Sequence, residues 1–390
     1  MKIQNIFSKT SEQYRSELIS RNPPIEAFLE NKVPVVIYPG ASLGRAAAKK
    51  LQARDINVVA FSDTKEANWN STIDGLEVIP PHSIDTKFPE CVVLIASALY
   101  DSEIRSNLAH HGVTRIYPLP FLSQILPEIF GTREYRDLAG SIFAEDAKND
   151  ILKVHGLLAD DISHFTFQSK LRYYLTLDKS LLDLVQTPNS IYFDPDLFSM
   201  EMGRIIADGG AFTGDTLAQF LKSSKGAFEH YYAFDPDPLV QERLHQVASV
   251  DPDKIQCIKA GLSNESRTLH FKATGLADSI IVKEAGAETI SIPVVDLDTF
   301  FADKEPPTFI KMDIEGSEAH ALFGAKNLIV KHKPVLAISI YHNPSDLWKI
   351  PLIIKDLLPE SKIYIRHYTR EIDDTVCYAI PTSHEASQIL

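Results

Sequence analysis

The segment whose residues most clearly suggest a chemical role spans residues 205–216 and reads I-I-A-D-G-G-A-F-T-G-D-T. An apolar run leads into Asp208, and three glycines follow before a helical pattern begins: Gly209, Gly210 and Gly214. Glycines let a backbone approach a ligand closely, and the helix after them offers free N–H groups. A phosphate loop would have Lys followed by Ser or Thr after its last glycine, where Asp215 and Thr216 stand here,. An acid at the start of the loop suits a ligand that carries a positive charge.

A second acid follows the next apolar run. Residues 230–234 read H-Y-Y-A-F and lead into Asp235 and Pro236. Asp235 stands 21 residues after Gly214 (235 − 214), the spacing at which an acid holds the hydroxyls of a ribose. Nicotinamide enzymes use the same arrangement, and an Asp at this position can also cap the following helix, so the pair alone does not identify the cofactor.

A third group of acids lies in residues 309–318, which read F-I-K-M-D-I-E-G-S-E. The apolar run predicts a buried strand, and Asp313, Glu315 and Glu318 follow it,. Doubly wound sheets bind their ligands at the carboxyl ends of such strands. We therefore expect this acidic group to face a ligand.

Together the motifs D-G-G-A at 208–211, A-F-D-P at 233–236 and I-K-M-D-I-E-G at 310–316 resemble the FkbM family of S-adenosylmethionine-dependent methyltransferases. Shorter segments at 259–263, 294–298 and 339–342 add to the resemblance, which extends over about residues 200–380. It implies an α/β class I methyltransferase fold with a doubly wound sheet, S-adenosyl-L-methionine as cofactor, and hydroxyls of sugars, polyketides or lipids as acceptors. The expected product is an O-methylated small molecule, most plausibly a sugar or polysaccharide precursor.

The resemblance also implies roles for individual residues. Asp208 and the glycine loop would line the methionine end of the cofactor, and Asp235 would hold its ribose. Gly261 and Leu262 would border the adenine, and Asp313 would lie near the reacting methyl. The family often has Asn at position 212 and usually Glu at position 235. The full set predicted to bind the cofactor is Asp208, Gly209, Gly210, Phe212, Gly214, Asp235, Pro236, Gly261, Leu262 and Asp313.

Methyl transfer to a hydroxyl needs the acceptor oxygen held close to the methyl and a group that takes the hydroxyl proton. The predicted catalytic residues are His342, Asp313 and Glu315, with His342 as a candidate base or, alternatively, a structural histidine. His367 is interpreted as structural. Asp313 and Glu315 have the oxygen ligands that magnesium prefers, but two carboxylates do not make a metal site, and none is predicted.

The elements that position these residues form two α/β regions with a helical region between them. We predict a Rossmann-like domain at 1–125, a helical connector at 126–198 and the methyltransferase domain at 199–390. Ser279, in the loop at 263–290, is expected to face the cofactor. Predicted strands lie at 33–38, 57–61, 92–96 and 114–117 in the first region, and at 204–207, 230–234, 255–260, 290–294, 308–312, 334–340, 361–366 and 376–380 in the second,.

The first α/β region contains a weaker version of the dinucleotide pattern. Gly40 and Gly44 follow its first predicted strand, and Asp63 follows the second. The region resembles the small Rossmann-like domains attached to sugar-modifying enzymes. It is expected either to bind a nucleotide or nucleotide-linked sugar or to serve as a scaffold for a homodimer.

Composition narrows the classes of function. With 39 Lys and Arg against 52 Asp and Glu, the chain has a formal net charge of −13, which disfavours a nucleic-acid partner,. The three cysteines, Cys91, Cys257 and Cys377, form no C-x-x-C pair, so a reducing, cytoplasmic location is expected,. No apolar run reaches the roughly 20 residues that span a bilayer.

Two alternative functions stay open. The first is a nucleotide-sugar oxidoreductase or epimerase that uses the N-terminal region; none of the fourteen tyrosines is followed four residues later by the Lys that short-chain enzymes of this kind need. The second is a non-catalytic module that senses a nucleotide.

Overall fold

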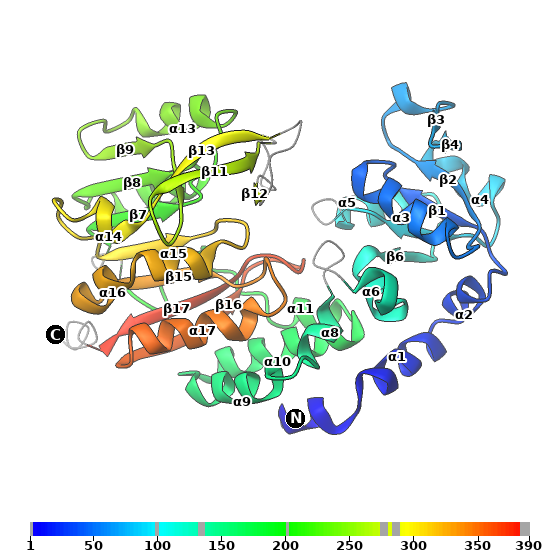
Figure 1. Cartoon of the computed structure of the whole chain (residues 1–390), viewed down its shortest axis with the longest axis horizontal. Helices are drawn as coiled ribbons and strands as arrows, with labels where there is room; N and C mark the ends of the chain where they lie inside the picture. The colour runs from blue at the N-terminus through cyan, green and yellow to red at the C-terminus, as the bar shows by residue number, and fades with distance from the viewer. Residues whose placement is uncertain are drawn as a thin grey trace. The chain divides into compact units, whose positions relative to one another are not determined.

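The computed structural model describes residues 3–97, 101–131, 137–199, 203–273, 280–282 and 289–382 (Figure 1). The chain divides into two compact units, the first made of residues 1–145 and 172–177 and the second of residues 146–171 and 178–390. Across the described ranges, no helix has the length and apolar character needed to cross a membrane.

The first unit is built around a 6-stranded sheet in the order β3-β4-β2-β1-β5-β6, parallel except at β3. Its elements are η1 (Ile3–Ser8), α1 (Ser11–Ser20), α2 (Pro23–Leu29), β1 (Val35–Tyr38), α3 (Ser42–Gln52), β2 (Val58–Ser62), η2 (Glu66–Asn68), β3 (Thr72–Ile73), β4 (Leu76–Ile79), η3 (Pro81–Ser83), α4 (Ile84–Lys87), β5 (Val92–Ile95), α5 (Asp101–His110), β6 (Ile116–Pro118), α6 (Leu119–Ile125), α7 (Pro127–Phe130) and α8 (Leu138–Ile142).

Both faces of this sheet are covered, which explains why its strands are apolar throughout. Val35 and Ile37 pack with apolar residues of α2, α3 and α6. Val36 and Tyr38 point to the other face, where α4 and α5 supply the core. The four strands predicted in this region are present. The short hairpin of β3 and β4 was missed, although its Asp74-Gly75 turn, with φ of 50° and 82°, has the left-handed geometry that an Asp-Gly pair favours,.

The second unit contains a 7-stranded sheet in the order β16-β17-β15-β14-β7-β8-β9 and a separate 4-stranded sheet in the order β10-β13-β11-β12. Its elements are α9 (Ala147–Leu157), α10 (Asp161–Thr176, whose last turn belongs to the first unit), α11 (Ser180–Asp183), β7 (Ile205–Gly209), α12 (Asp215–Ser224), β8 (His230–Phe234), α13 (Gln241–Ala248), β9 (Ile255–Ile258), β10 (Gly261–Leu262), β11 (Arg267–Lys272), β12 (Ile280–Val282), β13 (Ile290–Val295), α14 (Leu297–Phe300), β14 (Phe309–Met312), α15 (Glu318–Gly324), α16 (Lys326–His332), β15 (Val335–Ser339), α17 (Asp346–Leu357), β16 (Ser361–His367) and β17 (Thr375–Pro381).

The 7-stranded sheet has the class I methyltransferase topology, which confirms the predicted fold. Its strands are parallel except β17, which lies antiparallel between β15 and β16. The chain order reverses between β7 and β14, and ligands of doubly wound sheets bind at such a switch point,. The strand predicted at 290–294 is present as β13, which belongs to the smaller sheet, where it pairs with β10 and β11.

Close packing of a helix on the first sheet gives a test of the fold. In α3, a Cβ on Gly44 would lie 2.2 Å from the backbone oxygen of Pro39, whereas a Cβ on Gly156 in α9 meets nothing within 4 Å. We expect Gly44→Ala to destabilise the protein by about 1–3 kcal/mol through overpacking. Gly156→Ala, the matched control, should stabilise it by about 0.5–1 kcal/mol. Urea denaturation followed by circular dichroism measures both, and equal effects of the two variants would contradict the packing of α3.

Candidate active site

The glycine loop (residues 209–214) bends sharply from β7 into α12. Gly210 and Gly214 have φ of 78° and 85°, and a Cβ on Gly210 would lie 1.9 Å from the backbone oxygen of Asp313. Gly210 N and Ala211 N both donate to the carbonyl of Phe234 at the end of β8. Only glycine therefore fits at position 210, and the loop lies directly against the ends of β8 and β14.

Asp235 is joined to this loop by a hydrogen bond. Its Oδ2 accepts from Phe212 N at 2.8 Å and its Oδ1 from Asp237 N at 2.9 Å. Phe212 has a φ of 46°, an unusual value for a residue with a side chain, and such strain concentrates at functional sites,. Burial raises the pKa of Asp235 to about 6, against the two backbone donors that lower it. Asp235 and the glycine loop, which were predicted from separate motifs, thus meet at one edge of the sheet.

A buried ammonium group lies beneath the loop. Lys311 Nζ donates to Gly209 O at 3.0 Å and Gly210 O at 2.8 Å, and lies 3.0 Å from Asp208 Oδ1. Tyr231 donates to the other oxygen of Asp208 at 2.6 Å. Burial lowers the pKa of Lys311, but Asp208 and Asp313 outweigh that effect and raise it. Asp208 is fully buried and its carboxylate is occupied, so its side chain supports the loop from below.

Asp313, directly after β14, is held by two tyrosines. Tyr192 and Tyr341 donate to its two carboxylate oxygens, both at 2.8 Å. Tyr192 comes from the segment before β7 and has a φ of 65°, again in the left-handed region. Two donors on two oxygens fix the orientation of the Asp313 carboxylate.

His342, just after β15, lies among three carboxylates. Its Nδ1 is 2.9 Å from Glu318 Oε1, and its Nε2 is 3.4 Å from Asp313 Oδ1 and 3.5 Å from Glu315 Oε1. Glu318, at the start of α15, also accepts from Ile314 N at 2.8 Å. Glu315 has a φ of 55°, which turns the chain so that the acids on either side of it face the same imidazole.

The charges in this cluster are coupled. Burial opposes protonation of His342, yet Glu318, Glu315 and Asp313 raise its pKa well above the usual value. Burial likewise opposes ionisation of Asp313, but His342 and Lys311 hold its pKa below the usual value. Burial raises the pKa of Glu315. In the free protein at neutral pH the imidazole therefore carries a proton, which must leave before His342 can act as a base.

The remaining predicted residues lie nearby or apart. A Cβ on Gly209 would lie 2.6 Å from Leu262, and one on Gly261 3.7 Å from Pro236, so these four positions form one packed group. His367 is buried in β16; its Nδ1 is 2.9 Å from Thr375 Oγ1, and burial lowers its pKa to about 2, which agrees with a structural histidine. Ser279 lies outside the described residues.

Sequence reasoning overlooked several residues of this site. They have in common that their polar atoms are buried next to a predicted residue, and they are Tyr192, Tyr231, Lys311 and Tyr341. Lys311 carried a readable signal, because a lysine in the middle of an otherwise apolar buried strand must find an anionic partner,. The tyrosines carried none, because tyrosine is common in ordinary cores.

In the first unit, packing accounts for the weaker glycine pattern. A Cβ on Gly40 would lie 2.9 Å from the ring of Phe61, and Gly44 is needed for the contact with Pro39 described above. Asp63 accepts from Lys65 N at 2.8 Å and from Asn68 Nδ2 at 2.7 Å. Each of these residues therefore has a structural role in its own turn, and nucleotide binding by this region stays a prediction.

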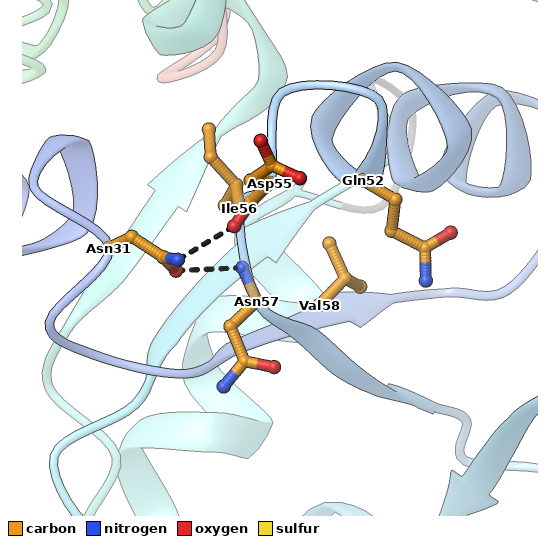
Figure 2. A pocket seen from close by; sticks show the side chains of 6 residues that line it. All are labelled: Asn31, Gln52, Asp55, Ile56, Asn57 and Val58. Atoms are coloured by element: carbon orange, nitrogen blue, oxygen red, sulfur yellow. Dashed lines mark hydrogen bonds between the residues drawn. The ribbon is translucent and has the colours of Figure 1, made fainter.

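A hollow in the first unit lies where the chain enters β2, and Figure 2 shows the residues that line it: Asn31, Gln52, Asp55, Ile56, Asn57 and Val58. The amide of Asn31 is engaged there, donating to Asp55 O at 2.7 Å and accepting from Asn57 N at 3.0 Å. This is the amino end of β2, opposite the edge at which α/β sheets bind ligands. We assign it no role in the chemistry.

Comparison with known proteins identifies the second unit. Residues 208–376 match the family described as the Methyltransferase FkbM domain. The protein carries an FkbM methyltransferase domain. The matched range begins at Asp208 and includes the glycine loop, Asp235, Asp313, Glu315 and His342. The family resemblance deduced from the three motifs is thereby confirmed.

One solved structure agrees with this assignment. The crystal structure of Methyltransferase FkbM from Methylobacillus flagellatus KT is 25% identical, with a TM-score of 0.68 over 93% of this chain and 92% of that one. An rRNA methylase from Streptococcus thermophilus is 17% identical, with a TM-score of 0.28 over 53% of this chain and 93% of that one. None of the curated proteins compared with the chain matches it.

The buried pair beneath the glycine loop predicts a large effect on stability. Lys311→Met leaves the Asp208 carboxylate buried without its cation, which should cost about 3–5 kcal/mol. Adding Asp208→Asn should recover part of this loss, while Lys331→Met, an exposed lysine of α16, should change stability by no more than about 0.5 kcal/mol. In a Trp69→Phe background, the fluorescence of Trp348 during urea denaturation reports the FkbM domain alone. Equal stability of the Lys311 and Lys331 variants would contradict a charged, paired Lys311.

Proposed function

We propose that the FkbM domain transfers a methyl group from S-adenosylmethionine to a hydroxyl of a small molecule, with a sugar or polysaccharide precursor as the acceptor class. The observation that carries this proposal is the hydrogen bond from Phe212 N to Asp235 Oδ2. It joins the glycine loop to the acid of the next strand, beside the acidic cluster that follows β14. A ribose-binding acid, a loop for the methionine end and groups able to handle a proton are thus available within one site.

The chemistry of Asp235 fits the ribose of this cofactor. The residue is only 7% exposed, and its raised pKa means that the charged form lacks sufficient donors. Two ribose hydroxyls would supply such donors and stabilise the carboxylate. When bound, the cofactor supplies an electrophilic methyl group on a sulfonium. Gly210 and Gly214 keep the backbone open to it, Phe212 and Pro236 border it, and Gly261 and Leu262 are proposed to lie beside the adenine.

Asp313, Glu315 and His342 are proposed as the catalytic group. Asp313 is oriented by Tyr192 and Tyr341, and its side chain is 24% exposed, so one face of the carboxylate can receive an acceptor hydroxyl. Glu315, 30% exposed at the side chain, lies on the same side of the imidazole. Holding the acceptor oxygen beside the methyl and receiving its proton are the two tasks that this cluster can perform.

The remaining parts of the proposal concern partners and location. The net charge of −13 supports a small acceptor over a nucleic acid,. The sugar class rests on the family resemblance, and a homodimer stays a prediction. All three cysteines are free, and Cys91 and Cys377 are buried, which supports a reducing compartment such as the cytoplasm,.

A calorimetric titration with S-adenosylmethionine, S-adenosylhomocysteine and NAD in parallel tests the choice of cofactor. We expect both adenosyl ligands to bind and NAD not to bind. Binding of NAD alone would favour the oxidoreductase alternative and overturn the proposal.

The pKa of Asp235 predicts how cofactor affinity depends on pH. The ribose hydroxyls need the ionised carboxylate, so affinity should be full well above pH 6 and fall as pH drops through about 6, reaching a loss of about tenfold at pH 5,. Asp235→Asn should bind S-adenosylhomocysteine weakly, with little change between pH 5 and 7. Calorimetry at several pH values measures this, and a pH-dependent affinity that survives in the variant would place the titrating group elsewhere.

Removal of the imidazole separates catalysis from cofactor binding. His342→Ala should lower turnover by about 10²–10⁴-fold, because the catalytic group loses its central member. Its affinity for S-adenosylmethionine should stay nearly unchanged, since no predicted cofactor contact involves His342. The assay follows methyl transfer to nucleotide-sugar acceptors, with His332→Ala, an exposed histidine of α16, as the control. Full activity of His342→Ala would show that the proton is taken elsewhere.

A further inference from the structure

The imidazole of His342 presents one nitrogen to a space bordered by two carboxylates. Among the described residues, Nε2 makes no hydrogen bond of good geometry, and the side chain is 5% exposed. The nearest oxygens on that side are Asp313 Oδ1 at 3.4 Å and Glu315 Oε1 at 3.5 Å, both beyond a good hydrogen bond,. A buried nitrogen that faces two carboxylates at these long distances leaves room for a shared ligand between them.

These two separations from Nε2 are compatible with ligands that share a metal ion. At a metal–ligand distance of about 2.1 Å, neighbouring ligand atoms lie about 3.0 Å apart in an octahedral site and about 3.4 Å apart in a tetrahedral one. We propose that His342 Nε2, Asp313 and Glu315 bind a divalent cation of the first transition row. One imidazole and two carboxylates form a mixed nitrogen and oxygen set, which favours Mn²⁺, Fe²⁺ or Zn²⁺ over Mg²⁺ and Ca²⁺.

Glu318 holds the ring from behind. Single ligand atoms of Asp313, Glu318 and His342 all lie within 4.8 Å of one another, so Glu318 is itself close enough to be considered as a ligand. Its Oε1, however, faces Nδ1 at 2.9 Å and also accepts from Ile314 N. One imidazole cannot give both nitrogens to the same ion. Glu318 is therefore the carboxylate that fixes the tautomer and orientation of a metal-binding histidine.

The surroundings suit a cation with open positions. Tyr192 and Tyr341 fix the Asp313 carboxylate, and the left-handed backbone of Glu315 sets its direction. Asp313 and Glu315 keep 24% and 30% of their side-chain surface exposed, so water or substrate oxygens can complete the coordination. A divalent ion also balances three clustered carboxylates better than the single proton on His342 does.

The cation would have a direct use in catalysis, and this part rests on the proposed function. A hydroxyl bound to a divalent ion loses its proton more easily and is held in a fixed place. Binding of the ion itself requires neither cofactor nor acceptor. The two proposals can therefore be tested separately.

The experiment titrates Mn²⁺ into the full chain and measures free Mn²⁺ by electron paramagnetic resonance, with Zn²⁺ and Mg²⁺ as competitors. We expect one site per chain, displaced by Zn²⁺ at lower concentrations than by Mg²⁺. His342→Gln and Glu315→Gln should weaken binding by more than about 100-fold, and Glu318→Gln by about 10–100-fold. Glu305→Gln makes the same chemical change at an exposed position of the same unit and should bind Mn²⁺ like the unaltered protein.

Absence of saturable Mn²⁺ binding, or equal affinity in the Glu315 and Glu305 variants, would overturn the cation site. Melting curves check that each variant folds, and Glu315→Asp, which keeps the charge but shortens the arm, should restore part of the affinity lost in Glu315→Gln. S-adenosylhomocysteine is titrated into the same samples. Binding of that ligand without Mn²⁺ binding would refute only the cation site, whereas Mn²⁺ binding without it would refute only the proposed methyl donor.

Discussion

The ammonium group of Lys311 determines where the glycine loop of this domain can lie. Its three donors meet the carbonyls of Gly209 and Gly210 and the carboxylate of Asp208, so β14 is attached to the turn that follows β7. A charge with 1% exposure is tolerated because Nζ donates to two carbonyl oxygens and an anion lies 3.0 Å away,. With β14 attached in this way, Gly210 packs directly against the backbone oxygen of Asp313. The glycine loop and the acidic cluster thereby share one support.

Strained backbone marks the same region. Phe212, Tyr192 and Glu315 all have left-handed φ values of 46°, 65° and 55°, although each has a side chain. Each of them also directs a group into the site: a backbone N–H toward Asp235, a hydroxyl toward Asp313, and a carboxylate toward His342. Such conformations cost about 1–3 kcal/mol apiece and persist when surrounding contacts enforce them. At these three positions the strained backbone agrees with a site whose geometry matters more than its local stability.

Charge is distributed within the site in two layers. Beneath the loop, Lys311 and Asp208 neutralise each other away from solvent. Nearer the surface, three carboxylates surround His342, whose imidazole carries one positive charge. Burial raises the pKa of Asp235 and Glu315 in this layer. A layer with excess negative charge and too few donors is suited to cationic or hydroxyl-bearing ligands. We therefore propose that the outer layer contacts the ligands and that the inner layer supports it.

Much of this domain follows from local sequence. Apolar runs predicted the strands. The edge of the sheet that holds the site was predicted from glycines at 209, 210 and 214 and acids at 208, 235 and 313, because parallel strands all end on the same side. The strand at 290–294 was predicted without its partners, because an apolar run does not say which neighbour it will pair with. Residues 267–272 and the short hairpin at 72–79 were missed because their half-exposed strands have weak patterns.

By itself, the sequence determined the α/β class, the family and the acids and glycines at the edge of the sheet, since these depend on residue type and spacing along the chain. Only the tertiary structure decided what each acid does. It directed Asp208 inward to Lys311, left Asp235 short of donors, and placed Glu318 and Tyr192 beside groups far away in the sequence. Burial and partners set the charge of an ionisable group, and both arise only when distant segments pack together.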